Sequence, residues 1–169
     1  MSVLAETDIR RLIGQSPPLI EGYIKLDEQV QANGFDLTLR DVSVMLSAGQ
    51  IALSNNDRKL TDLSLQPFDS NDFIMLAAGI YMVTYNEIVH LPKDIMALGR
   101  PRSSLLRCGV GVGTAVWDAG YEGRSQSLLT VHNPQGFRVQ KNARITQLVF
   151  MELTGKTEGY KGIYQNENT

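Results

Sequence analysis

The stretch from Arg102 to Arg107, which reads RSSLLR, carries residue types that could bind phosphate. Arg102 has a planar guanidinium that matches phosphate oxygens. Ser103 and Ser104 stand where a short helix is predicted to begin, so free backbone N–H groups and hydroxyls would converge there. Arg107 lies about one helical turn further on. The arrangement predicts a site for a small polyanion, although an ordinary serine-capped surface helix has the same pattern.

One aspartate, Asp118, follows the apolar run GVGTAVW and precedes the predicted turn AGYEG. An aspartate in a turn is most often a solvent-facing turn residue. Water attack on a phosphoryl group, however, needs a base that orients the water and cations that absorb charge. Because the Arg-Ser-Ser cluster precedes it closely, Asp118 is the candidate general base. Tyr121, three residues on, is the candidate for a ring that lies flat against a sugar.

Several other chemistries are excluded by the residues that the sequence lacks. There is no Walker loop, and GVGVGT has Thr114 where a dinucleotide fingerprint would need its third glycine. The single Cys108 cannot supply the cysteine pair of a zinc deaminase, and two histidines cannot build a His-rich metal site. No GxSxG motif marks a hydrolase serine. We expect His90 and His132 to be strand residues rather than catalysts.

A mainly β fold is predicted to position these residues. Runs rich in β-branched and aromatic residues alternate with Gly, Asn, Asp and Pro at turn-like spacing. Many short strands with few helices indicate a barrel or a double-sheet jelly roll. Strands are predicted over residues 110–117, 125–133, 137–140 and 145–153, and short helices over 9–13 (capped by Thr7), 92–99 and 103–108.

Length and composition favour a single domain. The 169 residues are enough to bury a core, and we assign residues 1–155 to it and the polar residues 156–169 to a flexible C-terminal lid segment. No apolar run approaches the ~18 residues that would span a bilayer. No membrane partner is therefore expected. With one cysteine the chain can form no internal disulfide, which predicts a cytoplasmic protein.

The charge is unevenly distributed along the chain. The net charge of −2 argues against an extended nucleic-acid surface. Residues 100–151 nevertheless hold seven basic and two acidic residues, against nine basic and sixteen acidic elsewhere. A local positive segment on an acidic background suits a small polyanion, although charge alone equally fits solvated strand residues.

Five segments in order resemble the motifs of the dUTPase and dCTP deaminase superfamily, and most closely its archaeal-type, deaminase-like dUTPases. GRPRSSLLRCG (99–109) resembles the second motif and GTAVWDAGYEGRS (113–125) the third. VQANGFDLTL (30–39) resembles the first, KNARITQLVF (141–150) the fourth, and GYKGIYQNE (159–167) the C-terminal lid. The resemblance therefore covers nearly the whole chain.

This resemblance implies a distorted jelly-roll β-barrel and a homotrimer with active sites shared between subunits. It implies hydrolysis of dUTP to dUMP and pyrophosphate, which keeps uracil out of DNA, with Mg²⁺ held mainly by the triphosphate. Asp118 would activate water, and Asp36 would support the metal–phosphate arrangement. The residues that it assigns to substrate binding are Arg102, Ser103, Ser104, Arg107, Gly113, Thr114, Val116, Tyr121, Gln147, Tyr160, Lys161, Tyr164 and Gln165.

The deaminase half of the superfamily needs a catalytic glutamate shortly after the Asp-x-Gly-aromatic turn. No acidic residue occurs from Gly123 to Met151, and Leu129 or Thr130 stands at the equivalent place. Because general acid–base transfer is worth ~10²–10⁴ in rate, we expect no deamination. The alternatives are a bifunctional dCTP deaminase/dUTPase, a non-catalytic nucleotide-binding homologue, and a capsid-like or lectin-like jelly roll. The last leaves the Arg-Ser-Ser cluster unexplained.

Overall fold

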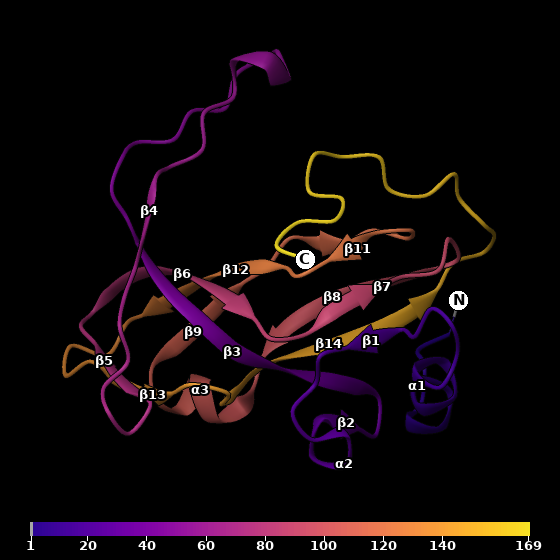
Figure 1. The fold of residues 1–169 in the computed structure, drawn as a ribbon, viewed down its shortest axis with the longest axis horizontal. Helices are drawn as coiled ribbons and strands as arrows, with labels where there is room; N and C mark the ends of the chain where they lie inside the picture. Colours follow the sequence, from indigo (N-terminus) through magenta and orange to yellow (C-terminus); the bar gives the residue numbers. More distant parts are fainter. Residues whose placement is uncertain (1) are drawn as a thin grey trace.

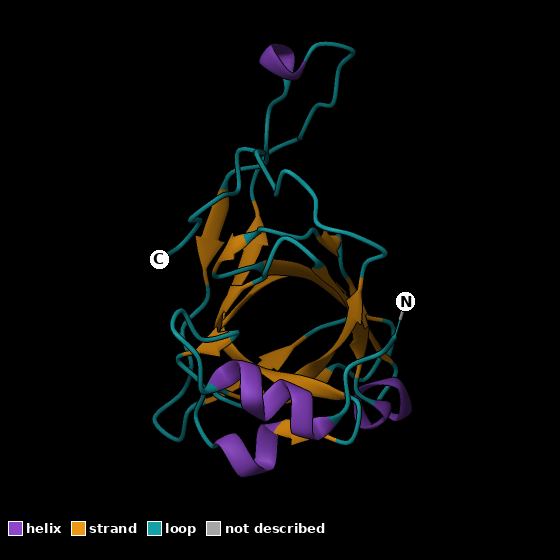
Figure 2. Cartoon of the chain, turned by 90° about the vertical axis from the view of Figure 1, so that its right-hand side faces the viewer, coloured by secondary structure: helices purple, strands orange, loops and turns teal. Residues whose placement is uncertain are grey.

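The structure is a computed structural model that describes residues 2–169. Its strands curl into a barrel, and the α-helices pack along one side of it (Figure 2). None of the helices in residues 2–169 is long and apolar enough to cross a membrane. The elements are α1 (Glu6–Ile13), β1 (Ile20–Glu21), α2 (Leu26–Gln29), β2 (Val30–Gln31), β3 (Gly34–Met45), η1 (Asn55–Asp57), β4 (Leu63–Leu65), β5 (Phe73–Leu76), β6 (Gly79–Tyr85), β7 (Ile88–His90), β8 (Ile95–Pro101), α3 (Ser103–Arg107), β9 (Val110–Gly113), β10 (Val116–Trp117), β11 (Glu122–Gly123), β12 (Gln126–Val131), β13 (Phe137–Gln140) and β14 (Arg144–Glu152).

The main sheet has the order β10-β8-β14-β3-β6-β12-β9, with β2 and β4 added to β3 (Figure 1). β9 at one end of this order contacts β8 near the other end, so the sheet closes on itself. Two smaller sheets, β1-β7-β11 and β13-β5, complete the structure. The predicted mainly β, jelly-roll type of barrel is confirmed.

The core lies inside the barrel because alternate strand residues point inward. In β3 the side chains of Phe35, Leu37 and Leu39 are at most 1% exposed, and Leu148 and Phe150 of β14 are fully buried. The apolar alternation that predicts strands in the sequence is therefore the same pattern that fills the interior.

A buried carboxylate, Glu87, ties β3 to α2 and to the β6–β7 turn. Its Oε1 accepts hydrogen bonds from Gln29 Nε2 at 2.7 Å and from Thr38 Oγ1 at 2.6 Å. Its Oε2 accepts the backbone N–H of Thr38 at 2.9 Å. Burial raises the pKa of Glu87, and these donors oppose that shift. A charge taken out of water is thus held by three converging donors.

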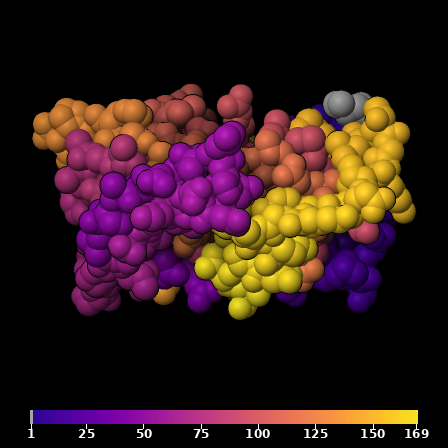
Figure 3. Space-filling view, turned by 90° about the horizontal axis from the view of Figure 1, so that it is seen from above, coloured from indigo at the N-terminus to yellow at the C-terminus, as the bar shows by residue number. Residues whose placement is uncertain are grey.

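Two segments, residues 46–62 and the C-terminal residues 156–169, lie outside the strands of the barrel (Figure 1). Residues 46–62 form an arm that projects from the end of β3 (Figures 1 and 2). Gln50 and Lys59 pair across it through backbone bonds of 2.7 and 2.9 Å, yet Ile51 is 81% and Leu53 108% exposed. Seen from above, the arm and the C-terminal segment cross the same face (Figure 3), and Leu65 of β4, which follows the arm, lines one groove together with Asn168 of the C-terminal segment.

Some predicted elements differ from the observed ones. Residues 95–101 are strand β8 rather than a helical turn, because Ile95, Ala97 and Gly99 alternate inward and β14 pairs along the whole length. Helix α1 begins after Ala5, without the predicted Thr7 cap. The strand predicted over 110–117 is divided into β9 and β10, which pair with different partners.

Candidate active site

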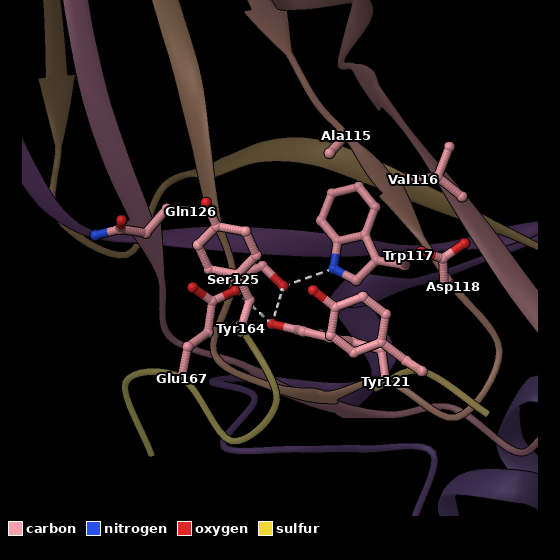
Figure 4. A pocket seen from close by; sticks show the side chains of 10 residues that line it. Ala115, Val116, Trp117, Asp118, Tyr121, Ser125, Gln126, Tyr164 and Glu167 are labelled. Atoms are coloured by element: carbon pink, nitrogen blue, oxygen red, sulfur yellow. Dashed lines mark hydrogen bonds between the residues drawn. The ribbon is translucent and has the colours of Figure 1, made fainter. Parts of the chain in front are cut away.

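A pocket of about 270 Å³ opens where β10 ends (Figure 4). Its walls come from the β10 region, the turn that follows it, the start of β12 and the C-terminal segment. The lining residues are Ala115, Val116, Trp117, Asp118, Tyr121, Ser125, Gln126, Tyr160, Tyr164 and Glu167.

A chain of three hydrogen bonds runs along one wall of this pocket. Trp117 Nε1 donates to Ser125 Oγ at 2.6 Å, and Ser125 Oγ lies 2.9 Å from the Tyr121 hydroxyl. The Tyr121 hydroxyl donates to Glu167 Oε1 at 2.8 Å. Burial raises the pKa of Tyr121, so its hydroxyl keeps the hydrogen that it donates. The tyrosine is only 6% exposed, and its ring meets Tyr160 edge-to-face with centroids 5.7 Å apart.

Asp118 lies at the rim of the pocket and is exposed. Its side chain points away from the Tyr121–Glu167 contact (Figure 4). The turn behind it is closed by the Tyr121 N–H, which donates to the Asp118 carbonyl at 3.0 Å. Gly120 has φ +84°, and a Cβ there would lie 2.6 Å from Gly159 Cα. Only glycine fits this turn, because the C-terminal segment packs directly on it.

A second cluster lies at the other end of β8, around the buried Asp36. Asp36 is 1% exposed, with Oδ2 3.1 Å from Arg102 Nε and 3.6 Å from Arg144 Nη1. These are ion pairs without hydrogen-bond alignment. Burial raises the pKa of Asp36, and the two arginines oppose that shift. Gln147 pairs with Asp36 on one side and with Arg100 on the other.

The position of Asp36 bears on its predicted support of a metal. Its carboxylate is enclosed and faces two guanidinium groups, so it holds Arg102 in place rather than meeting solvent. Within residues 2–169 no group of three or more His, Cys, Asp and Glu is arranged to hold a metal ion. A carboxylate that is enclosed and already faces two guanidinium groups does not fit the role of a direct magnesium ligand.

The two clusters are far apart in one chain. Val116 pairs with Leu98 and Trp117 with Ala97, so the next residue, Asp118, lies opposite Met96. From Met96 to Arg102 the chain advances six residues, about 20 Å at ~3.3 Å per strand residue. A base near Asp118 and phosphates near Arg102 of the same chain could not meet on one phosphorus atom.

The C-terminal segment is bound to its own chain beside the pocket. Tyr160 N–H donates to the Ala119 carbonyl at 2.9 Å, and Asn166 N–H to the Glu122 carbonyl at 2.8 Å. The Glu167 carbonyl accepts from Arg124 N–H at 2.9 Å. The flexibility predicted for residues 156–169 stays a prediction, but in this structure they form a wall of this pocket and not a cover over Arg102.

The predicted site residues thus fall into three groups. Val116, Asp118, Tyr121, Tyr160 and Tyr164 line the pocket. Arg102 and Gln147 lie at the far end of β8, with Ser103, Ser104 and Arg107 exposed on α3 beside them. Gly113, Thr114, Lys161 and Gln165 line neither cluster, although Gln165 Nε2 donates to the Gly120 carbonyl at 3.2 Å.

Ala115 and Trp117 belong to the stretch 113–117 whose main-chain groups the family resemblance assigns to the pyrimidine edge, and three further lining residues were not predicted: Ser125, Gln126 and Glu167. Trp117 and Ser125 lie inside the third-motif segment, and their polar atoms next to Tyr121 are a signal that could have been used. Glu167 is 46 residues away from its partner Tyr121. No local pattern in the sequence indicates such a contact.

The start of β12 bears on deamination. Leu129, one of the two places predicted for the missing glutamate, is 2% exposed and faces the core. The β12 residue that lines the pocket is Gln126, whose Nε2 donates to Thr84 Oγ1 at 3.1 Å. β12 therefore offers an amide and no carboxylate to this pocket.

The fold is shared with solved structures, among them a dCTP deaminase and a dUTPase. The dCTP deaminase from Agrobacterium tumefaciens has a TM-score of 0.65 and 23% identity, covering 88% of this chain and 47% of that one, so this chain spans about half the deaminase's length. EIAV dUTPase has a TM-score of 0.52 and 16% identity, covering 89% of this chain and 97% of its own. The barrel is that of the dUTPase and dCTP deaminase class.

Similar sequences show to which family within this class the chain belongs. A family profile described as dCTP deaminase-like matches residues 3–153, and the chain belongs to this family. A probable deoxyuridine 5'-triphosphate nucleotidohydrolase of Methanosarcina mazei is 48% identical over 100% of this chain and 99% of its own. The deoxyuridine 5'-triphosphate nucleotidohydrolase of Methanocaldococcus jannaschii is 36% identical over 82% of this chain and 88% of its own. The family resemblance predicted from the motifs is confirmed.

Proposed function

We propose that the chain is a dUTP nucleotidohydrolase, which cleaves dUTP to dUMP and pyrophosphate. One observation carries the proposal: an exposed Asp118 stands at the rim of a nucleoside-end pocket to which β12 contributes Gln126 and no carboxylate. The full-length relatives named as enzymes of this activity support it. A candidate base for water attack, without a carboxylate from β12, favours hydrolysis of dUTP over deamination of dCTP.

In the proposed reaction Asp118 orients a water molecule for in-line attack on the α-phosphorus and accepts its proton. The new bond joins the water oxygen to the α-phosphorus, and the bond to the bridging oxygen breaks, so that pyrophosphate leaves. Arg102 and Gln147 would bind the phosphates, with Ser103 at the start of α3. The pyrimidine and deoxyribose would occupy the pocket that Trp117 and Tyr121 line.

We infer that the phosphate-binding residues come from a second copy of the chain. The separation of about 20 Å along β8 supports this, because one copy cannot bring Arg102 to its own Asp118. The arm of residues 46–62 supports it too, since Ile51 and Leu53 are exposed on a segment held in shape by backbone bonds. We propose that the assembly is a homotrimer with active sites shared between subunits. We also propose that it works in the cytoplasm.

We propose that Mg²⁺ enters with the nucleotide, held by its phosphates. Bound there, it would neutralise charge on the triphosphate and supply Lewis-acid stabilisation as the leaving group departs. Asp36 would act indirectly, by holding Arg102 in position.

The test is to incubate the purified protein with Mg²⁺ and dUTP, dCTP or UTP, and to assay pyrophosphate and ammonia separately. We expect pyrophosphate from dUTP only and no ammonia from dCTP. Ammonia from dCTP would show that another group replaces the missing β12 glutamate, and Glu167, the second carboxylate of the pocket, would be the first to examine. No product from any of the three would leave a nucleotide-binding protein.

A further inference from the structure

The C-terminal Glu167 is a carboxylate that no motif assigns a role, and it sits at the end of the hydrogen-bond chain in the pocket. It is held there by the backbone, because its carbonyl accepts from Arg124 N–H and its neighbour Asn166 donates to Glu122. Its side chain reaches Tyr121 and lines the pocket (Figure 4). A tail that only covered the site would not need this inward contact.

The direction of the chain follows from the chemistry of its members. An indole N–H can only donate, so Ser125 Oγ accepts from Trp117. The single Ser125 hydrogen then points to the Tyr121 oxygen, and the Tyr121 hydrogen to Glu167 Oε1. An ionised carboxylate can only accept, so it fixes the direction of every bond before it.

The pocket of about 270 Å³ exists with the tail in place. Tyr160, Tyr164 and Glu167 line it and do not fill it, so the docked tail is a wall of the pocket and not a plug. Tyr121, the ring expected against the sugar, is meanwhile held on two sides, by Tyr160 at its edge and by Glu167 at its hydroxyl.

We propose that Glu167 is a positioning residue for the nucleoside end of dUTP: it fixes the Tyr121 hydroxyl and, through Ser125, the Trp117 indole. The inference rests on the proposed dUTP hydrolysis and deepens it. Glu167 acts on binding of the nucleoside, which is equal in the ground and transition states, and leaves the attack by water to Asp118.

Three single variants test the proposal by steady-state kinetics with dUTP. Glu167→Ala is expected to raise KM about tenfold and to leave kcat within about twofold, because it removes binding common to both states. Glu167→Gln is expected to stay near wild type, since its amide oxygen can still accept from Tyr121. Glu158→Ala removes a carboxylate from an exposed part of the same segment and is the matched control, with no change expected.

A second readout does not depend on turnover. Trp117 is the only tryptophan of the chain and begins the hydrogen-bond chain, so its fluorescence reports on Glu167 without nucleotide. We expect Glu167→Ala to change the emission, and Glu167→Gln and Glu158→Ala to preserve it. Tyr121→Phe removes the same donated hydrogen, so combining it with Glu167→Ala is expected to raise KM no further than either change alone.

The outcomes separate this inference from the proposed function. A wild-type enzyme that hydrolyses dUTP together with an unchanged KM in Glu167→Ala would overturn the positioning role alone. An equal loss in Glu167→Gln and Glu167→Ala would also overturn it, because the acceptor would then not be what matters. A wild-type protein that fails to hydrolyse dUTP would overturn the proposed function. The Trp117 fluorescence of the variants without nucleotide would still show whether Glu167 fixes the hydrogen-bond chain.

Discussion

At the scale of single residues, the surroundings of two carboxylates separate their roles. Asp118 is exposed at the pocket rim, where it can reach a bound water. Asp36 is 1% exposed against Arg102 and Arg144, where it can only hold those side chains. We therefore propose that the same carboxylate chemistry serves proton transfer at Asp118 and positioning at Asp36.

Asp118→Asn is the variant that examines the base. The amide keeps the size of the side chain but cannot accept the proton of the attacking water, so hydrolysis of dUTP is expected to fall by at least ~10². Nucleotide affinity is expected to change by less than about threefold, because the pocket walls remain. Calorimetric titration with a non-hydrolysable dUTP analogue measures the affinity; retained turnover would refute the assignment.

The docking of the C-terminal segment is expected to depend on pH through Glu167. Burial raises the pKa of Glu167 above the usual 4.5, and the bond from Tyr121 opposes this. A raised value means that the protonated form favours docking: docking is strongest below pH 4.5 and weakens as the pH rises through the raised value. Amide hydrogen exchange at Tyr160 and Asn166, corrected for intrinsic rates, should show this trend, and Glu167→Gln should abolish it.

The sequence predicts those site residues whose signal is local. Asp118 and Tyr121 are marked by one short segment, and both line the pocket. Ser125 lies in the same short segment and could have been predicted, whereas Glu167 could not, because this glutamate gains its role only through a contact to Tyr121 that is 46 residues away in the sequence. The separation of Asp118 from Arg102 also follows from strand register, which composition does not reveal.

At the scale of elements, tertiary pairing decides between helix and strand. Residues 92–99 have a proline near the start and a glycine at the end, which is the local pattern of a short helix. Pairing of β8 with β14 along Ile95–Pro101 makes them a strand instead. The core strands were predictable because their alternation is strong, whereas this segment is apolar enough for either structure.

The three donors on Glu87 predict the effect of Glu87→Gln. A carboxamide has one oxygen and one NH₂, so at least one of the Gln29 and Thr38 donors would face another donor. We expect a loss of about 1–3 kcal/mol in the free energy of unfolding, measured by urea denaturation. Glu28→Gln is the control: this glutamate pairs with Lys25 in an exposed ion pair, and a change within about 0.5 kcal/mol is expected. Equal stability of the two variants would contradict the buried network.

At the scale of the whole molecule, one barrel carries two clusters at opposite ends of β8, which we propose are the two halves of a shared site. The pocket with Asp118 at its rim is at one end, and the Arg102–Asp36 cluster is at the other. A closed ring of identical copies solves this problem, since each copy can present its first half to one neighbour and its second half to the other.

The most direct test of a site shared between copies of the chain is a mixing experiment with two inactive variants, Asp118→Asn and Arg102→Ala. Each variant alone is expected to show almost no dUTP hydrolysis. Co-expressed in equal amounts, they are expected to recover about a quarter of the wild-type activity, because random assembly in a ring pairs an intact Asp118 with an intact Arg102 at about one interface in four. A mixture that stays as inactive as its parts, although the two variants assemble together, would contradict a site shared between copies.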